Sequence, residues 1–429
     1  MTEYYKDTLA NGLRVVTVEM AHLHSAEMLC YVGVGGRHET ATTAGVSHFL
    51  EHMLFRGTAD FASSLELERA FEAIGGAVNA STDSETTCFH SRLHPDCLSE
   101  GAALFASMLL RPRLCDLEVE KRIILEEAQE DYNEHGIEIN PDNLTGRLLW
   151  PGHPLSQPTI GTRASIAGLD EVALRRHFAT YFTPANAVIV VAGRVQRAAV
   201  VAAVGAAFAG WCGGEPLASP PFVPPPEGTV PELVWIKDSD SQVTLQLAFR
   251  VPGRGEGSNL PLRVLRRILS GGGAARLMLR LREQLGLTYN VEANLSLFAD
   301  SGCLAVDLAV APDNLLPAVT EVLEIFARLR REAVGSDELE RVVRGYHYDL
   351  EFSRDHTDEL AVRFGWGELV GCLRTLEDDR RELAGVTPEG LRQAAATLFR
   401  PGVLKGAVVG PFRAADRKRV EAVLHKFGV

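Results

Sequence analysis

The side chains best suited to chemistry lie close together in the stretch Ser47–Thr58. This stretch contains His48, Glu51 and His52 in the pattern His-x-x-Glu-His. On a helix, residues four apart project from the same face one turn apart, so the two imidazoles would converge. Two imidazoles at this spacing suit one tetrahedral zinc ion, and a neighbouring glutamate would reach a water molecule bound to that ion. The pattern also arises by chance, so the zinc interpretation requires a third ligand and a place for a substrate.

An acidic run further along the chain supplies candidates for the third ligand, because a catalytic zinc ion keeps three protein ligands and one open position. The candidates are Glu118, Glu120, Glu126, Glu127 and Glu130. Glu120 and Glu127 are two helical turns apart and share a face, whereas Glu126 projects about 100° away. We expect Ile123 and Ile124 to be buried, and carboxylates on a partly apolar face are unusual unless something pairs them. The alternative is a solvated acidic helix, which is what most charge runs form.

Periodicity and turn residues predict the elements that hold these side chains. A threonine, Thr42 or Thr43, caps a helix that carries the histidines and ends at Gly57. Residues 77–82 and 86–93 alternate in the manner of a β-hairpin, and the acidic run follows a helical period.

Composition places limits on the class of protein. The chain has 429 residues, which is long for one core, so two or more domains are expected. Its net charge of −13 offers no basic stripe for phosphates and argues against a nucleic-acid partner. No secretory signal or membrane-spanning run is visible, and the seven cysteines lack the spacing of a metal site or a disulfide framework. We therefore expect a cytoplasmic protein with reduced cysteines and no membrane association.

A proline-rich stretch divides the sequence at mid-chain. Residues 213–228 contain six prolines and cannot form a regular element. The predicted elements follow the same order on both sides: strand, helix, helix, hairpin, helix, helix. We predict a duplicated α+β fold in which each half is an antiparallel-rich sheet with helices packed on one face. The expected domains are residues 1–212 and 233–429, joined by a linker at 213–232. Residues 262–267 occupy the position of the metal motif in the second half and contain no histidine or glutamate.

Three segments together resemble the pitrilysin, insulysin and mitochondrial processing peptidase family of inverzincin metallopeptidases. They are the stretch Ser47–Thr58, residues 75–80 (Gly-Gly-Ala-Val-Asn-Ala) and the acidic helix. The resemblance extends over nearly the whole chain, including the duplication and the linker.

The resemblance implies roles for the residues that match the family's zinc motif. One zinc ion per chain would be bound by His48, His52 and Glu127, with Glu51 as the general base. Glu127 is preferred to Glu126 because the sequence Glu-Ala-Gln-Glu from residue 127 fits the family's pattern. The resemblance also implies that Glu120, seven residues before the third ligand, orients one of the ligands.

Two further segments match substrate-contacting parts of the family. Residues 282–289 resemble its arginine–tyrosine segment, which implies that Arg282 and Tyr289 anchor the peptide carbonyl and stabilise the oxyanion. Without that resemblance, a surface arginine and a core tyrosine would be the ordinary interpretation. Asn79 and Ala80, on an expected edge strand, would hold an extended peptide by backbone hydrogen bonds.

The expected function is that of a zinc-dependent endopeptidase acting on peptides, or on leader and presequence segments, within a closed chamber. The resemblance implies a homodimer, or a heterodimer with a metal-less sister chain. The rival hypotheses are a non-catalytic core or scaffold subunit of a larger complex, and a metal-binding module that does not hydrolyse. All five metal-site positions are present in this sequence, which favours the enzyme.

Overall fold

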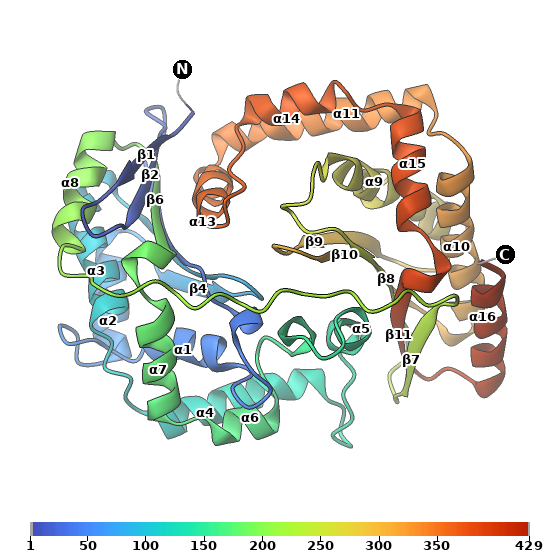
Figure 1. The fold of residues 1–429 in the computed structure, drawn as a ribbon, viewed down its shortest axis with the longest axis horizontal. Coiled ribbons are helices and arrows are strands. Elements are labelled where there is room, and N and C mark those ends of the chain that lie inside the picture. Colours follow the sequence, from blue (N-terminus) through green and yellow to red (C-terminus); the bar gives the residue numbers. More distant parts are fainter. Residues whose placement is uncertain (1–2, 428–429) are drawn as a thin grey trace. The chain divides into compact units, whose positions relative to one another are not determined.

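A β-sheet lies at the centre of each of the two units into which the chain divides (Figure 1). The computed structural model describes residues 3–427. Unit 1 contains the chain up to residue 129 together with residues 157–220 and 350–376. Unit 2 contains residues 130–156, residues 221–349 and the chain from residue 377 onward. Each unit is therefore built from three separate stretches of the sequence.

The sheet of unit 1 has six strands in the order β1-β2-β6-β3-β5-β4, which puts β4 at one edge. The strands are β1 (Tyr5–Thr8), β2 (Arg14–Glu19), β3 (Ala26–Val32), β4 (Val78–Thr82), β5 (Thr87–Leu93) and β6 (Ala187–Gly193). All neighbouring strands are antiparallel except β2 and β6. Every residue of β3 and β6 is buried, as expected for apolar strands covered on both faces.

Helices cover one face of this sheet. They are α1 (Val46–Leu54), α2 (Ser64–Ile74), α3 (Leu98–Leu110), α4 (Leu117–Glu127), α6 (Arg163–Gly168), α7 (Glu171–Tyr181) and α8 (Arg197–Ala207). Their apolar side chains form one core with the sheet, in which Phe49, Phe71 and Phe105 are fully buried. Because Phe49, Leu50 and Met53 fix one side of α1 to this core, the histidines of α1 lie on its other side.

The second face of the same sheet is covered by a segment from the far end of the sequence. Within it, α12 (Thr357–Ala361), a π-helical turn (Val362–Trp366) and α13 (Gly367–Leu369) pack on β3 and β6. In Figure 1, α13 is the orange-red element beside β6. The approach is closest at Gly365, where an added Cβ would lie 2.5 Å from Cγ1 of Val190.

The sheet of unit 2 has the order β7-β11-β8-β10-β9, and only β7 and β11 are parallel. Its strands are β7 (Glu232–Lys237), β8 (Val243–Val251), β9 (Val291–Leu297), β10 (Gly302–Val310) and β11 (Leu404–Gly410). Its helices include α9 (Leu260–Ser270), α10 (Leu315–Arg331), α15 (Pro388–Leu398) and α16 (Ala414–Phe427). In its core, the rings of Phe326 and Phe399 are stacked, and Phe249 meets both of them edge to face.

Three further helices complete the chain. α5 (Pro141–Leu149) packs against β8 and β11. α11 (Ser336–Phe352) and α14 (Leu376–Leu383) run across the boundaries between the two units in the sequence. Both sheets therefore receive a covering helix from a stretch distant in sequence from most of their strands.

The predicted α+β fold with two similar, antiparallel-rich halves is confirmed. The proline-rich residues 213–228 form neither helix nor strand. The helices on the second face of each sheet are an addition that the sequence pattern did not indicate. The domain boundaries at residues 212 and 233 remain a prediction. The seven cysteines are all free, and Cys30 and Cys88 are buried. Among residues 3–427, no helix combines the length and apolar character needed to cross a bilayer.

Substituting Gly365 tests the packing of the covering segment in unit 1. Gly365→Ala places a methyl group against Val190 and the Tyr31 ring, so we expect a loss of about 1–3 kcal/mol in stability. Gly345→Ala is the matched control, because Gly345 lies within α11 and an added Cβ meets nothing within 4 Å. The free energy of unfolding of that control should rise by up to about 1 kcal/mol, because alanine favours a helix more than glycine does. Thermal unfolding of both variants checks this, and equal melting temperatures would contradict the described packing.

Candidate metal centre

The side chains of His48, His52 and Glu127 come together where α1 packs against α4 in unit 1. The Nε2 atoms of the two histidines are 3.2 Å apart. The Glu127 carboxylate oxygens lie 3.7 Å from Nε2 of His48 and 3.6 Å from Nε2 of His52. No other group of three histidine, cysteine or acidic side chains within residues 3–427 brings its ligand atoms so close.

This set of donors fits a zinc ion. Zinc binds imidazole nitrogen and carboxylate oxygen at about 2.0–2.2 Å, so tetrahedral ligand atoms stand roughly 3.4 Å from one another. The three observed separations of 3.2, 3.6 and 3.7 Å agree with that spacing. Burial, together with the nearby charge of His52, lowers the pKa of His48 to about 4, which keeps this imidazole neutral. A metal ligand must be neutral in this way.

Glu120 holds His52 in the orientation that a ligand requires. Its buried carboxylate accepts a hydrogen bond from Nδ1 of His52 at 2.8 Å and another from Nε of Arg56. Because Nδ1 is occupied in this way, the lone pair on Nε2 faces His48 and Glu127. Burial acts to raise the pKa of Glu120, but the hydrogen bonds from His52 and Arg56 lower it overall, so the carboxylate stays charged.

Arg56 was not predicted as part of the site. It lies four residues after His52, in the turn that follows α1. A positively charged residue at this spacing could have been recognised as a partner for the acid that orients His52. The signal is present in the sequence but becomes specific only when the position of Glu120 is known.

Helical geometry explains the direction of the other side chains of α4, and one of them differs from the sequence prediction. Glu126 turns away from the histidines and accepts a hydrogen bond from Gln129 at 2.9 Å. Ile124 is fully buried, as predicted. The prediction for Ile123 is wrong, because its side chain is 44% exposed. One residue corresponds to about 100° of rotation, so the buried strip that contains Glu120 and Ile124 leaves Ile123 outside it.

Glu51 lies beside the ligand atoms and is 8% exposed. Its Oε2 accepts a hydrogen bond from the hydroxyl of Thr82 at 2.6 Å. Burial raises the pKa of Glu51, and the hydrogen bond from Thr82 partly opposes that shift. A carboxylate with a raised pKa at this position suits proton transfer near neutral pH.

The start of α1 differs from the sequence prediction, and the predicted threonine cap is wrong. The cap residue is Gly45, with φ of +87°, and because it has no side chain, the buried carboxylate of Glu39 serves as the acceptor at this end of the helix. That carboxylate accepts the backbone N–H groups of Gly45 and Ser47 at 2.6 and 2.8 Å. Thr43 instead accepts a hydrogen bond from the backbone of Thr40. A carboxylate is a stronger acceptor than a hydroxyl at the positive end of a helix.

A hollow of about 450 Å³ opens beside the cluster, and strand β4 forms one of its walls. Its lining residues are Glu51, His52, Phe55, Arg56, Ser64, Val78, Asn79, Ala80 and Glu120. Asn79 and Ala80 therefore share one hollow with Glu51 and His52, and β4 is an edge strand as predicted.

Arg282 and Tyr289 lie together in unit 2. Arg282 belongs to a π-helical segment, Met278–Gln284, and its guanidinium carbon stands 4.9 Å from the centre of the Tyr289 ring. Tyr289 is 81% exposed, so it is not a core residue. Their contact with substrate remains a prediction.

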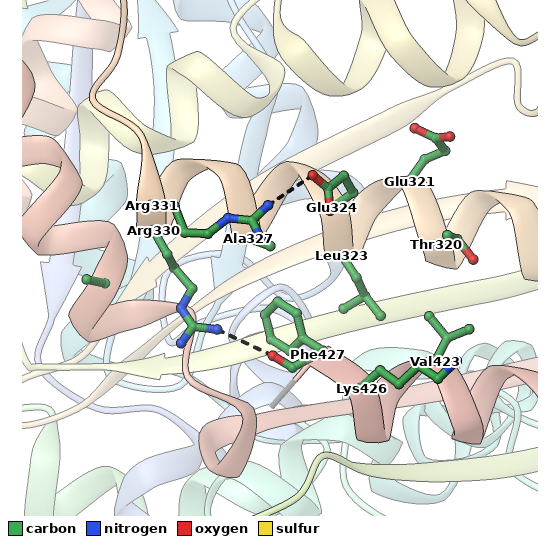
Figure 2. A pocket seen from close by; sticks show the side chains of 11 residues that line it. Thr320, Glu321, Leu323, Glu324, Ala327, Arg330, Arg331, Val423, Lys426 and Phe427 are labelled. Atoms are coloured by element: carbon green, nitrogen blue, oxygen red, sulfur yellow. Dashed lines mark hydrogen bonds and ion pairs between the residues drawn. The ribbon is translucent and has the colours of Figure 1, made fainter. Parts of the chain in front are cut away.

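A larger hollow, of about 550 Å³, lies between α10, α15 and α16 in unit 2 (Figure 2). Two of its cations already have partners. Arg331 pairs with Glu324, while Arg330 donates to the carbonyl oxygen of Phe427 and lies over its ring. No histidine or cysteine lines this hollow, so size alone does not identify the chemical site.

Comparison with known proteins gives consistent results. Residues 14–163 match a family model described as Insulinase (Peptidase family M16), and residues 169–346 match one described as Peptidase M16 inactive domain. An uncharacterized zinc protease of Mycobacterium tuberculosis is 32% identical, over 95% of this chain and 93% of its own. The uncharacterized zinc protease YmxG of Bacillus subtilis is 30% identical, over 91% and 95% respectively. A protease from Helicobacter pylori shares the fold, with a TM-score of 0.86 at 20% identity, over 95% of this chain and 99% of that chain.

Removing the charge from Glu120 tests whether it orients His52. We expect Glu120→Gln to weaken zinc binding by about 10–100-fold, as measured by titration against a competing chelator. Glu118→Gln is the matched control, because Glu118 lies on the same helix, is exposed and pairs with Lys121. Equal zinc affinities in the two variants would contradict the orienting role.

Glu39 predicts a dependence of stability on pH. Burial raises its pKa from 4.5 to about 7, although the hydrogen bonds from Ser47 and Gly45 oppose the shift. A raised carboxyl pKa stabilises the fold below pH 4.5, and this contribution is lost as the pH rises through 7. Relative to Glu39→Gln, the free energy of unfolding of the zinc-free wild type should therefore fall by on the order of 3 kcal/mol between pH 4.5 and 8. Denaturant unfolding across this range checks the prediction, and a constant difference between the two proteins would refute it.

Proposed function

Because this chain belongs to the M16 family of peptidases, we propose that it is a zinc-dependent endopeptidase that cleaves peptides or leader and presequence segments. The observation that carries the proposal is the placement of Glu51 beside the His48–His52–Glu127 donor set, in a hollow walled by an edge strand. The names of the relatives and the chemistry of the donors both point to zinc.

The proposed roles follow from the positions of the side chains. His48, His52 and Glu127 would hold one zinc ion, which when bound polarises a carbonyl group and lowers the pKa of water. Glu51 would accept a proton from the attacking water and pass it to the leaving amine. Glu120 would keep His52 in the ligand tautomer, since it already accepts the Nδ1 hydrogen bond.

The substrate would lie extended along β4. An edge strand presents unpaired backbone groups, and a peptide that adds to it gains main-chain hydrogen bonds with little demand on its side chains. Asn79 and Ala80 supply this edge next to Glu51. Such binding favours unfolded peptides over folded proteins.

Arg282 and Tyr289 would complete the site by anchoring the peptide carbonyl and stabilising the oxyanion. The exposure of Tyr289 and its contact with the guanidinium group of Arg282 are consistent with a pair available to a ligand. We propose that the chain works as a homodimer enclosing a chamber, or as a heterodimer with a metal-less sister chain. Light scattering on the purified protein, alone and with such a sister, distinguishes the two.

The rival function is that of a non-catalytic scaffold subunit. The second half of the chain matches a model described as an inactive domain. A scaffold subunit would not need metal-binding side chains. The retention of a complete donor set together with Glu51 favours the peptidase. A metal-binding module without hydrolysis would leave Glu51 without a chemical role.

The decisive experiment uses Glu51→Gln. Wild-type protein should digest a library of unfolded peptides, lose this activity with a chelator and regain it with zinc. Glu51→Gln should bind zinc normally but cleave about 10²–10⁴-fold more slowly, because only proton transfer is removed. Glu72→Gln, a change at an exposed acid on α2, should leave both properties unaltered. Wild-type protein that binds zinc and cleaves nothing would support the scaffold instead.

A further inference from the structure

The hydroxyl of Thr82 makes the one hydrogen bond that Glu51 receives within residues 3–427. We propose that Thr82 is a positioning residue that fixes the Glu51 carboxylate in its working orientation, an inference that rests on the proposed peptidase function. Thr82 is the last residue of β4, and its side chain faces α1 across the sheet edge. The donor–acceptor distance is 2.6 Å, which is typical of a short hydrogen bond from a hydroxyl to a charged oxygen.

The distances show that Glu51 is the stronger acceptor for the hydroxyl proton of Thr82. Thr82 lies 3.5 Å from the hydroxyl of Thr87, its partner across the hairpin. Thr87, however, donates its single proton to the backbone carbonyl of Val34 at 2.9 Å. Each hydroxyl has one proton to give, so Thr87 does not donate to Thr82, and its oxygen at 3.5 Å is a weaker acceptor for the Thr82 proton than the Glu51 carboxylate at 2.6 Å.

The backbone around Thr82 is held by the turn that follows it. The carboxylate of Asp83 accepts the backbone N–H groups of Glu85 and Thr86, both at 2.6 Å, and the hydroxyl of Thr86 at 2.8 Å. The carbonyl oxygen of Asp83 accepts the N–H of Gly36. The hydroxyl of Thr82 is therefore presented from a rigid position and not from a loose strand end.

The geometry assigns different tasks to the two carboxylate oxygens of Glu51. Oε2 is bound to Thr82, while no hydrogen bond within the described residues occupies Oε1. A glutamate side chain has three rotatable bonds, and a single fixed oxygen restricts all of them. Thr82 thus leaves Oε1 in one place, where it can accept a proton from water beside the donor set. Misplacement of a reacting group by about 1 Å can reduce the rate 10²-fold.

The test compares Thr82→Val, Thr82→Ser and the control Ser81→Ala. Valine keeps the shape and strand preference of threonine but removes the donor, whereas serine restores the donor. Ser81 is an exposed neighbour on the same strand, on its other side. We expect Thr82→Val to retain zinc and KM while kcat falls about 10–100-fold. Thr82→Ser should recover kcat to within about threefold, and Ser81→Ala should match the wild type.

A crystal structure of zinc-free Thr82→Val supplies a readout that does not depend on activity. Glu51 should leave its wild-type rotamer or occupy more than one. Unchanged kcat in Thr82→Val, equal losses in the valine and serine variants, loss of zinc in parallel with activity, or an unmoved Glu51 would each overturn the inference. If the wild type itself cleaves no peptide, the proposed function fails, and the position of Glu51 in the crystal still tests what Thr82 fixes.

Discussion

The carboxylate of Glu120 is the interaction on which the arrangement of the site depends. It is almost fully buried, and a buried charge is tolerated only when it is paired and hydrogen-bonded. Both of its partners, His52 and Arg56, come from α1 or the turn that follows it, so the requirement to pair this charge sets α4 against α1. Two helical turns further along α4, the same register brings Glu127 to the histidines.

A second constraint acts on the opposite end of α1. Gly45 adopts a left-handed conformation and lies so close to Gly161 that a side chain at either position would strike the other segment's backbone. The carboxyl group of Glu39 accepts the backbone N–H groups of Gly45 and Ser47. The Ser47 hydroxyl, next to His48, lies 2.9 Å from Nε2 of buried His177, whose pKa is lowered by burial to about 3. The helix is thus fixed at both ends by buried polar contacts, and its side chains have little freedom to shift relative to α4.

Most of the regular elements could be predicted because local periodicity determines them. The helix at Leu315–Arg331 and the hairpin that contains Asn79 follow from apolar spacing and turn residues. The spacing of the two histidines and Glu51 predicts that they lie together on one helix, as they do on α1. Local patterns do not say which distant segment covers a surface, so the packing of Gly365 on Val190 could not be derived. They also cannot show which carboxylate or hydroxyl reaches across the fold.

Glu39 and Thr82 illustrate this second limit. Neither residue lies at a helical or strand spacing from the histidines, so periodicity could not predict its contact with α1 or Glu51. Each acts through a contact made by tertiary folding, one at the start of α1 and one from the end of β4. The threonine cap predicted for α1 fails for the same reason, because local rules consider only the nearest acceptors in sequence. A buried carboxylate six residues before Gly45 takes that place.

The two sheets differ at the edges formed by β4 and β9. In unit 2 the helix equivalent to α1 is α9, and the edge strand is β9. Side chains from α9 already occupy that edge: Ser270 accepts the N–H of Ala293, and Arg266 donates to its carbonyl oxygen. In unit 1, no side chain within residues 3–427 bonds to the backbone of Asn79 or Ala80. The half without the donor set thus has its β9 edge bonded to its own helix, whereas the half with the donor set leaves the backbone of Asn79 and Ala80 without such a bond among the described residues.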